Sequence, residues 1–313
     1  MSLTKPLRGI IPPLITPLNP DFTLDYPSLI KTIDHTISGG VHGLFILGTT
    51  GEFASLSSDV KNEMISMSCA KVDGRVPVLV GITDCSFAQS LKLAKKALDS
   101  GAKAVVAAPP FYMNIDQSEL INYYQKLADK IELPLMLYNM PSHTGMSIEA
   151  NTVEKLSHHP NIIGIKDSSG DLRYFQSLCE LFEGRPNFTL LVGPEEYLVE
   201  TMNMGAHGGV SGGANLFPKL YVKLYEAILA KNSEQIQALQ VSILFLSQNL
   251  YSHGTYKSNY LKGLKASMSF LGLCKGILAL PLCAYSDEEK QSLRKKYDVV
   301  EARVKSILNT SAN

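Results

Sequence analysis

Eight short apolar runs recur along the first 231 residues, and each is followed by an amphipathic segment of helical length. The runs are Gly9–Ile15, Gly43–Leu47, Val76–Gly81, Ala104–Ala108, Pro134–Tyr138, Ile162–Lys166, Thr189–Val192 and Gly208–Ser211. Runs that are apolar throughout, rather than alternating, are typical of strands buried on both faces of a parallel sheet. The repeat averages about 28 residues, which fits one strand–helix unit.

Eight such units in succession predict an α/β fold, a (β/α)8 TIM barrel. The alternative is an open doubly wound sheet, which would be favoured by a G-x-G-x-x-G turn after the first strand. The first run leads instead into Thr16-Pro17-Leu18-Asn19-Pro20, which is not such a turn. The closed barrel is therefore the favoured fold, and we expect it to occupy residues 1–231 as the catalytic domain.

The pattern changes in residues 232–313, where no further strand is predicted. Three stretches there are typical of helices: Gln235–Leu250, Tyr256–Phe270 and Asp287–Leu308. This predicts a helical C-terminal segment packed on the barrel, with a position at a subunit interface as the alternative.

Charge and composition limit the partners. The chain has 29 basic and 29 acidic side chains, whereas proteins that bind nucleic acid or anionic membranes carry a basic excess. No apolar run approaches the roughly 20 residues of a membrane span, and the start, MSLTKPLRG, lacks the apolar region of a secretory signal. We therefore expect a cytoplasmic protein that binds neither nucleic acid nor membrane. No C-x-x-C pair or histidine spacing indicates a metal site.

The sixth run is the most informative, because it ends in Lys166. Active sites of (β/α)8 barrels lie at the carboxyl ends of the strands. Burial at that position disfavours the charged form of a lysine, and a neutral amine in a pocket can attack a ketone to form a Schiff base. A lysine that merely extends to solvent is the competing interpretation. The following loop, Asp167–Gly170, offers no aliphatic surface for that path, so the catalytic interpretation is favoured.

Two other strand ends carry candidate residues. The second run is followed by Gly48-Thr49-Thr50-Gly51-Glu52, where backbone amides and hydroxyls could hold a carboxylate or phosphate oxygen. A simple tight turn explains this loop equally well. The fifth run ends in Tyr138, which by itself could be only a packing aromatic. Taken together, however, these groups have complementary functions. Lys166 could form a covalent iminium, Tyr138 could transfer protons, and the loop after the second run could bind the substrate carboxylate.

In order and spacing, these motifs resemble the dihydrodipicolinate synthase / N-acetylneuraminate lyase superfamily over nearly the whole chain. The resemblance rests on Gly48-Thr49-Thr50-Gly51-Glu52, Tyr138-Asn139-Met140-Pro141, Gly164-Ile165-Lys166-Asp167 and Leu261-Lys262-Gly263-Leu264-Lys265-Ala266. It implies a (β/α)8 barrel with a C-terminal helical segment, usually assembled as a tetramer, a dimer of dimers. It also implies a class I lyase acting on pyruvate or another 2-oxo acid without a metal or organic cofactor.

The resemblance assigns roles to individual residues. Lys166 matches the Schiff-base lysine, and Tyr138 matches the general acid/base. Thr49 matches a hydroxyl of the proton relay. Tyr112 matches a tyrosine that one protomer contributes to the relay of the other across the dimer interface. The positions implied in substrate binding are Thr50, Gly48, Gly51, Gly193 and Ser211.

One departure from the family pattern bears on the substrate. Where true dihydrodipicolinate synthases carry an arginine that clamps the carboxylate of aspartate semialdehyde, this chain has His143. An imidazole cannot reproduce the bidentate guanidinium fork and would better suit a hydroxyl or neutral group. The segment Asn259–Lys265 is also more like that of the sugar-acid and hydroxy-oxo-acid aldolases than the N-P-x-P-x-K stretch of the synthases.

These features predict a lyase for a 2-keto-3-deoxy sugar acid or a 4-hydroxy-2-oxo acid. Synthesis of 4-hydroxy-tetrahydrodipicolinate from pyruvate and aspartate semialdehyde is the second possibility. A third is a sensor that binds a 2-oxo acid without turning it over, which the full set of relay residues disfavours.

Overall fold

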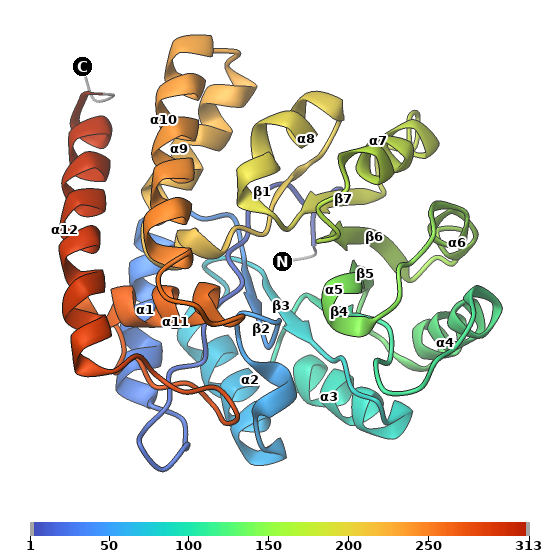
Figure 1. Ribbon diagram of the computed structural model, residues 1–313. Coiled ribbons are helices and arrows are strands. Elements are labelled where there is room, and N and C mark those ends of the chain that lie inside the picture. Colours follow the sequence, from blue (N-terminus) through green and yellow to red (C-terminus); the bar gives the residue numbers. More distant parts are fainter. Residues whose placement is uncertain (1–2, 311–313) are drawn as a thin grey trace.

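The computed structural model describes residues 3–310. Its eight strands form one parallel sheet in the order β1-β8-β7-β6-β5-β4-β3-β2, surrounded by helices (Figure 1). The strands are β1 (Gly9–Ile10), β2 (Leu44–Ile46), β3 (Val78–Gly81), β4 (Ala104–Ala107), β5 (Leu135–Asn139), β6 (Ile162–Asp167), β7 (Thr189–Val192) and β8 (Gly208–Gly209). The predicted (β/α)8 barrel is confirmed.

Helices alternate with the strands and cover the outside of the sheet. The α-helices are α1 (Tyr26–Ser38), α2 (Ser58–Val72), α3 (Phe87–Asp99), α4 (Gln117–Lys130), α5 (Pro141–Thr144), α6 (Ala150–Leu156), α7 (Leu172–Leu181), α8 (Leu198–Met204), α9 (Pro218–Leu229), α10 (Ser233–Leu246), α11 (Asn259–Phe270) and α12 (Asp287–Thr310). Short turns of other helical type are η1 (Phe53–Ser55), η2 (Glu195–Tyr197), η3 (Gly212–Asn215) and η4 (Ser247–Tyr251). No helix within residues 3–310 is long and apolar enough to span a membrane.

Side-chain caps explain where several helices begin. Ser57 accepts a hydrogen bond from the Val60 amide at the start of α2. At α4, Asp116 and Glu119 form a reciprocal capping box. Such caps satisfy amides that have no partner within the helix.

The first strand is shorter than its apolar run. The sequence predicts a strand over Gly9–Ile15, but β1 ends at Ile10. Pro12 and Pro13 follow, and proline has no N–H with which to continue the ladder. The barrel still closes beside β2, because the Leu14 amide donates to the Phe45 carbonyl (2.8 Å) and the Phe45 amide donates to the Pro12 carbonyl (3.0 Å).

Apolar side chains fill two regions, one on each face of the sheet. Phe45, Val106 and Met136 belong to a cluster inside the barrel. Val105 and Leu137 belong to a larger cluster that includes the surrounding helices. Adjacent residues of one strand thus enter different clusters, as the alternation of side chains along a strand requires.

β6 contains one more residue than β5 over the same stretch. Leu135 pairs with Ile162, whereas the next residue of β5, Met136, pairs with Gly164. Ile163 is therefore an inserted residue, a β-bulge. An insertion of this kind reverses the face on which all later side chains of the strand lie.

The bulge decides where Lys166 lies. Beyond it, Tyr138 pairs with Lys166, and Tyr138 is part of the cluster inside the barrel. In a regular strand Lys166 would share the face of Ile162, which packs in the outer cluster with the helices. The extra residue therefore brings the lysine to the inner face, beside Tyr138.

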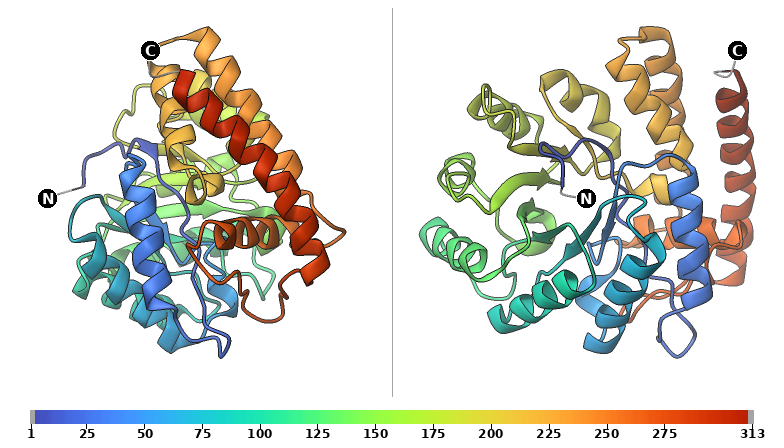
Figure 2. Two further views of the ribbon diagram at one scale, coloured as in Figure 1. Left: turned by 90° about the vertical axis from the view of Figure 1, so that its left-hand side faces the viewer. Right: turned by 180° about the vertical axis from the view of Figure 1, so that it is seen from behind.

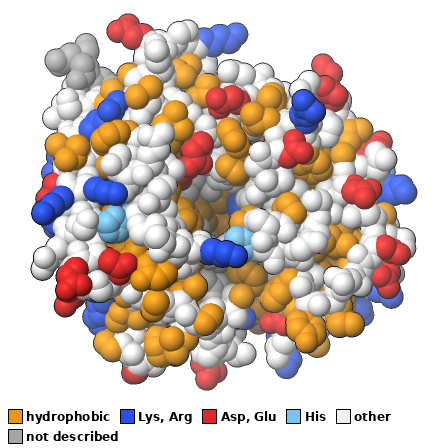
Figure 3. All heavy atoms as spheres, viewed as in Figure 1, with side chains coloured by type: hydrophobic (Ala, Val, Ile, Leu, Met, Phe, Trp, Pro, Cys, Tyr) orange, Lys and Arg blue, Asp and Glu red, His pale blue; other side chains and the backbone are white. Residues whose placement is uncertain are grey.

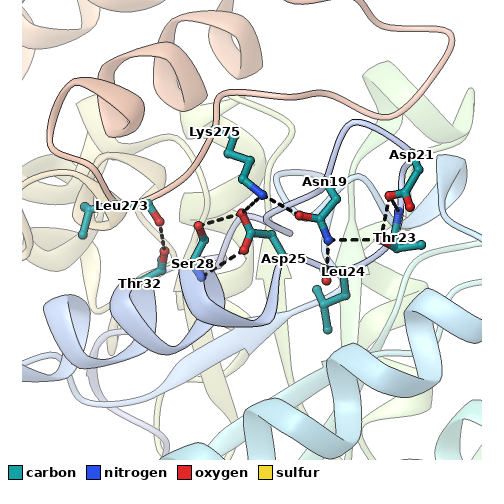
Figure 4. Close-up of polar contacts among 9 residues, drawn as sticks. All are labelled: Asn19, Asp21, Thr23, Leu24, Asp25, Ser28, Thr32, Leu273 and Lys275. Carbon is teal, nitrogen blue, oxygen red and sulfur yellow. Dashed lines mark hydrogen bonds and ion pairs between the residues drawn. The ribbon is translucent and has the colours of Figure 1, made fainter.

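The C-terminal helices lie against the barrel. α12 runs alongside α9 and α10 in each view (Figures 1 and 2). The segment after α11 is tied to the start of α1, where Lys275 donates to Asn19 (2.6 Å) and pairs with Asp25 (3.2 Å), as Figure 4 shows. α9 ends at Leu229 and α10 begins at Ser233. The division into domains of residues 1–231 and 232–313 stays a prediction, and its ends, residues 1–2 and 311–313, lie outside the described part.

A buried ion pair joins the barrel to the C-terminal segment. Lys265 on α11 forms an ion pair with Glu52, and both side chains are 1% exposed. Lys265 also donates to the Ile277 carbonyl (2.7 Å), and the Ala279 amide donates to the Glu52 carboxylate (2.7 Å). Glu52 ends the loop that carries Thr49 and Thr50, so the pair connects that loop to the residues after α11.

Lys265→Met is expected to lower the free energy of unfolding by about 3–5 kcal/mol, because it leaves the Glu52 carboxylate buried without a cation. Urea unfolding at fixed protein concentration measures the loss. The matched control is Lys95→Met, which removes a pair with Asp99 in which both side chains are exposed, at 64% and 55%, and which should therefore lower the free energy of unfolding far less. Equal losses in the two variants would contradict this interpretation.

Candidate active site

A cavity of about 640 Å³ opens at the carboxyl ends of the strands. Its lining includes Thr49 after β2, Ala108 after β4, Tyr138 on β5, Lys166 on β6 and Gly193 after β7. Figure 3 shows the corresponding hollow in the middle of this face, with basic and histidine side chains at its rim. The volume is within the range of small-molecule sites.

The Lys166 side chain is enclosed, with 5% of the residue exposed. Its ammonium nitrogen donates to the Ser168 hydroxyl (2.9 Å) and lies 3.8 Å from the centre of the Tyr138 ring. No ion pair holds this nitrogen within residues 3–310. A hydroxyl and an aromatic face are weaker restraints than a carboxylate, so the nitrogen can turn toward a molecule in the cavity.

Tyr138 and Thr49 meet across the barrel. Their hydroxyl oxygens are 3.0 Å apart, which is hydrogen-bonding distance. The contact joins residues from the ends of β5 and β2 directly beside Lys166. The structure therefore brings together three of the four predicted catalytic residues in a geometry that allows proton transfer.

The ends of β5 and β6 are fixed to one another by a buried polar network. The Asn139 side chain donates to the Asp167 carboxylate (2.8 Å) and accepts from the Ile148 amide (2.9 Å). Burial raises the pKa of Asp167. Since Asn139 and Asp167 directly follow Tyr138 and Lys166, the network holds the two candidate catalytic side chains in register.

The C-terminal segment supplies part of the cavity wall. The Tyr260 hydroxyl lies 3.1 Å from the Thr50 hydroxyl, and its ring packs edge-on against Tyr251 at 4.9 Å. Burial raises the pKa of Tyr260 well above its ordinary value, so its phenol keeps its proton. Sequence reasoning missed both tyrosines, because they follow no strand end and reach the cavity only through the packing of α11 and η4.

Glu195 is a third residue that the sequence interpretation missed. It lines the cavity and accepts from the Gly213 amide (2.7 Å) and the Tyr221 hydroxyl (2.5 Å). Burial, together with the nearby charge of Glu196, raises the pKa of Glu195 to about 7. It can therefore donate or accept a hydrogen bond near neutral pH. It follows β7 by three residues. A search for candidate residues just after the carboxyl end of each strand, the rule that pointed to Lys166, could therefore have found it.

His143 and Lys257 also line the cavity. His143 lies on α5, where its ring contacts the Ser142 hydroxyl (3.0 Å). Burial, and then the charge of Lys166, lowers the pKa of His143, which favours the neutral imidazole. Within the described chain no arginine lines the cavity. A guanidinium fork for a second carboxylate is thus not among the lining groups.

The predicted binding residues divide into two sets. Thr50 and Gly193 line the cavity, whereas Gly48, Gly51 and Ser211 do not. A side chain at Gly48 would approach the Phe45 ring to 2.6 Å, and one at Gly193 would meet the Ser168 hydroxyl at 1.9 Å. These two glycines therefore allow close packing around the site.

The two remaining positions, Gly51 and Ser211, are buried but do not line the cavity. Gly51 accepts a hydrogen bond at its carbonyl from Thr16 (2.7 Å). The Ser211 hydroxyl is buried without a hydrogen-bond partner among the described residues.

Tyr112 lies apart from the other candidate catalytic residues. Its side chain is 83% exposed and does not line the cavity of its own chain, whereas its neighbour Phe111 does. Met113 is also 69% exposed. The loop between β4 and α4 thus presents adjacent large apolar side chains to solvent.

Within residues 3–310, no three or more histidine, cysteine, aspartate or glutamate side chains are grouped so that they could hold a metal ion.

Comparison with known proteins gives one consistent relationship. The profile of the dihydrodipicolinate synthetase family matches residues 6–299. The solved structure of dihydrodipicolinate synthase from Bacteroides thetaiotaomicron is 46% identical, with a TM-score of 0.92 over 94% of this chain and 99% of that one. YagE of Escherichia coli K12, solved in complex with pyruvate, is 29% identical, with a TM-score of 0.89 over 95% of this chain and 99% of that one. The "probable 2-dehydro-3-deoxy-D-pentonate aldolase" of E. coli K12 is 33% identical over 91% of this chain and 94% of its own length.

Proposed function

Because the chain belongs to the dihydrodipicolinate synthetase family, we propose that it is a class I lyase that cleaves a 2-keto-3-deoxy sugar acid or a 4-hydroxy-2-oxo acid to pyruvate and an aldehyde. The observation that carries the proposal is the cluster of Lys166, Tyr138 and Thr49 in the cavity, with contacts of 3.8 Å and 3.0 Å. An amine, a phenol and a relay hydroxyl in mutual contact are the groups that Schiff-base chemistry requires.

In this mechanism Lys166 attacks the carbonyl carbon next to the substrate carboxylate and forms an iminium with loss of water. In that step the Tyr138 phenol, connected to Thr49, gives its proton to the departing hydroxyl group, which leaves as water. The resulting Tyr138 oxyanion then takes the proton of the 4-hydroxyl group while the bond between carbons 3 and 4 breaks. The iminium accepts the electron pair as an enamine, and the aldehyde leaves. Protonation of the enamine and hydrolysis then release pyruvate and restore Lys166.

The remaining lining residues fit the two ends of such a substrate. The Thr50 hydroxyl and the amides of its loop would hold the carboxylate. Glu195, Tyr260 and the neutral imidazole of His143 are hydrogen-bonding groups suited to the hydroxyls of the remaining carbon chain. A cavity of about 640 Å³ leaves room for a sugar acid.

Synthesis of 4-hydroxy-tetrahydrodipicolinate is the second candidate, favoured by the name of the B. thetaiotaomicron relative at 46% identity. Its second substrate, aspartate semialdehyde, carries an additional carboxylate. Lys257 is the cation other than Lys166 among the lining residues, and it offers a point charge rather than a bidentate fork. His143 therefore keeps this candidate second.

We also propose that the enzyme acts as a homo-oligomer, in which Tyr112 reaches the relay of a neighbouring protomer. Its 83% exposure and its exposed neighbours Phe111 and Met113 support this role, since large apolar side chains that meet solvent together are typical of an interface. The dimer-of-dimers tetramer and the cytoplasmic location stay predictions.

A substrate panel tests the proposed reaction. Pyruvate release from several 2-keto-3-deoxy sugar acids and 4-hydroxy-2-oxo acids is followed with lactate dehydrogenase and NADH, beside a condensation assay with pyruvate and aspartate semialdehyde. We expect the preferred cleavage substrate to reach a kcat/KM of about 10⁴ M⁻¹s⁻¹ or more. Faster condensation would make the enzyme a synthase, and binding without product across the panel would make the protein a sensor.

A further inference from the structure

Lys262 is a buried cation outside the proposed catalytic cluster. The residue is 1% exposed, and within residues 3–310 it forms no ion pair with a carboxylate. Its nitrogen lies 3.2 Å from the centre of the Tyr256 ring and 5.4 Å from that of Tyr285. The polar contact of this nitrogen is the Cys283 sulfur, at 3.4 Å. Aromatic faces offset part of the cost of burying the ammonium, but its hydrogen bond goes to a thiol, an uncommon acceptor.

The two partners differ in their access to solvent. Cys283 is exposed, whereas Lys262 is enclosed by its aromatic neighbours. A small oxidant can therefore reach the sulfur from solvent, and the Lys262 nitrogen, 3.4 Å away, is close enough to react with the oxidised sulfur. A partly exposed thiol beside a cation is the setting in which cysteine oxidation is selective.

We propose that Lys262 and Cys283 form a modification site, at which hydrogen peroxide drives formation of a sulfur–nitrogen bond between the two side chains. The product is a sulfenamide, which dithiothreitol reverses. The inference does not rest on the proposed lyase activity.

The chemistry proceeds in two steps. The Cys283 sulfur first takes one oxygen of hydrogen peroxide, the O–O bond breaks, and the thiol becomes a sulfenic acid with release of water. Lys262, after losing its ammonium proton to solvent, then attacks that sulfur, and the S–O bond breaks with release of a second water. One thiol, one amine and one peroxide thus give one sulfenamide and two waters. The peroxide is reduced by two electrons, and the sulfur is oxidised by two.

The bond would join two segments that border the active-site cavity. Leu261, next to Lys262, and Leu282, next to Cys283, both line the cavity, as do Lys257 and Ser258. A covalent link would therefore restrain the part of the cavity wall that the C-terminal segment supplies, and peroxide would change access to the site.

Peptide mass spectrometry tests the proposal on the full chain treated with hydrogen peroxide and then digested. We expect a linked pair of peptides containing Lys262 and Cys283, lighter by two hydrogen atoms than the separate peptides, in most of the molecules. Dithiothreitol should restore the separate peptides. Because the readout is mass, it is independent of whether the lyase assay succeeds.

Cys85 provides a control within the same molecule. It is also exposed, and it has no hydrogen bond to a lysine among the described residues, so it should oxidise without forming a link. Lys262→Arg keeps the positive charge but removes the amine and should abolish the link. Cys283→Ser, an exposed substitution that should leave folding intact, should abolish it as well.

Three results would overturn the proposal. The first is Cys283 converted to sulfinic acid without a link to Lys262. The second is a link that retains an additional oxygen atom, which the sulfenamide step cannot give. The third is a lysine link at Cys85 as abundant as the one at Cys283.

Discussion

Lys166→Ala is expected to lower kcat/KM by at least ~10⁴-fold, because removal of a covalent nucleophile leaves only the rate that binding and electrostatics supply. The cavity should persist, since Lys166 is held by the Ser168 hydroxyl and the Tyr138 ring rather than by an ion pair. Pyruvate or substrate can therefore still bind. What is lost is the iminium that accepts electrons when the carbon–carbon bond breaks.

Borohydride reduction in the presence of pyruvate measures the covalent step directly. The wild-type protein should gain one reduced pyruvate adduct per chain at Lys166, and Lys166→Ala should gain none. Lys257→Ala is the matched control, because Lys257 is the other lysine lining the cavity, and it should keep the adduct. An undiminished adduct in Lys166→Ala would remove Lys166 from the mechanism.

Tyr138→Phe is expected to slow turnover by a factor of ~10²–10⁴, the range for loss of a general acid/base. The substitution keeps the aromatic ring that lies 3.8 Å from the Lys166 nitrogen and removes only the hydroxyl that contacts Thr49. The loss should therefore appear in kcat rather than in substrate binding, and the reduced pyruvate adduct should still form, more slowly. Steady-state kinetics and adduct formation over time measure the two effects.

Two further variants show whether the phenol and Thr49 act as one relay. Thr49→Val should also lower kcat, and the double variant should lose much less than the product of the two single effects, because groups acting as a unit are not additive. Tyr260→Phe removes a buried phenol that contacts Thr50 instead and should change KM more than kcat. An unchanged rate in Tyr138→Phe would contradict its proposed role.

Much of the fold follows from local pattern alone. Continuous apolar runs predict strands buried on both faces, and seven of the eight runs contain the observed strands with only small differences at their ends. The run at Gly9–Ile15 differs most, because Pro12 and Pro13 end the ladder after Ile10. The strand-end rule likewise led to Lys166, Tyr138 and Thr49, which do lie together.

Residues that reach the cavity through long-range packing could not be found by looking at the ends of the strands. Tyr260 and Tyr251 come from segments after the barrel, and the Glu52–Lys265 pair joins residues 213 positions apart in the chain. Sequence spacing carries no information about these contacts, because they depend on how α11 and the segment after it return to the barrel.

The amino-acid sequence by itself determined the repeating strand–helix units and the residue types at the strand ends. Tertiary structure alone decided the face on which Lys166 lies. Side chains alternate between the two faces of a strand, so a single inserted residue moves every later side chain to the opposite face. That insertion, at Ile163, exists only in the pairing of β6 with β5. The same IIGIK sequence in a regular strand would direct the lysine toward the helices instead of the cavity.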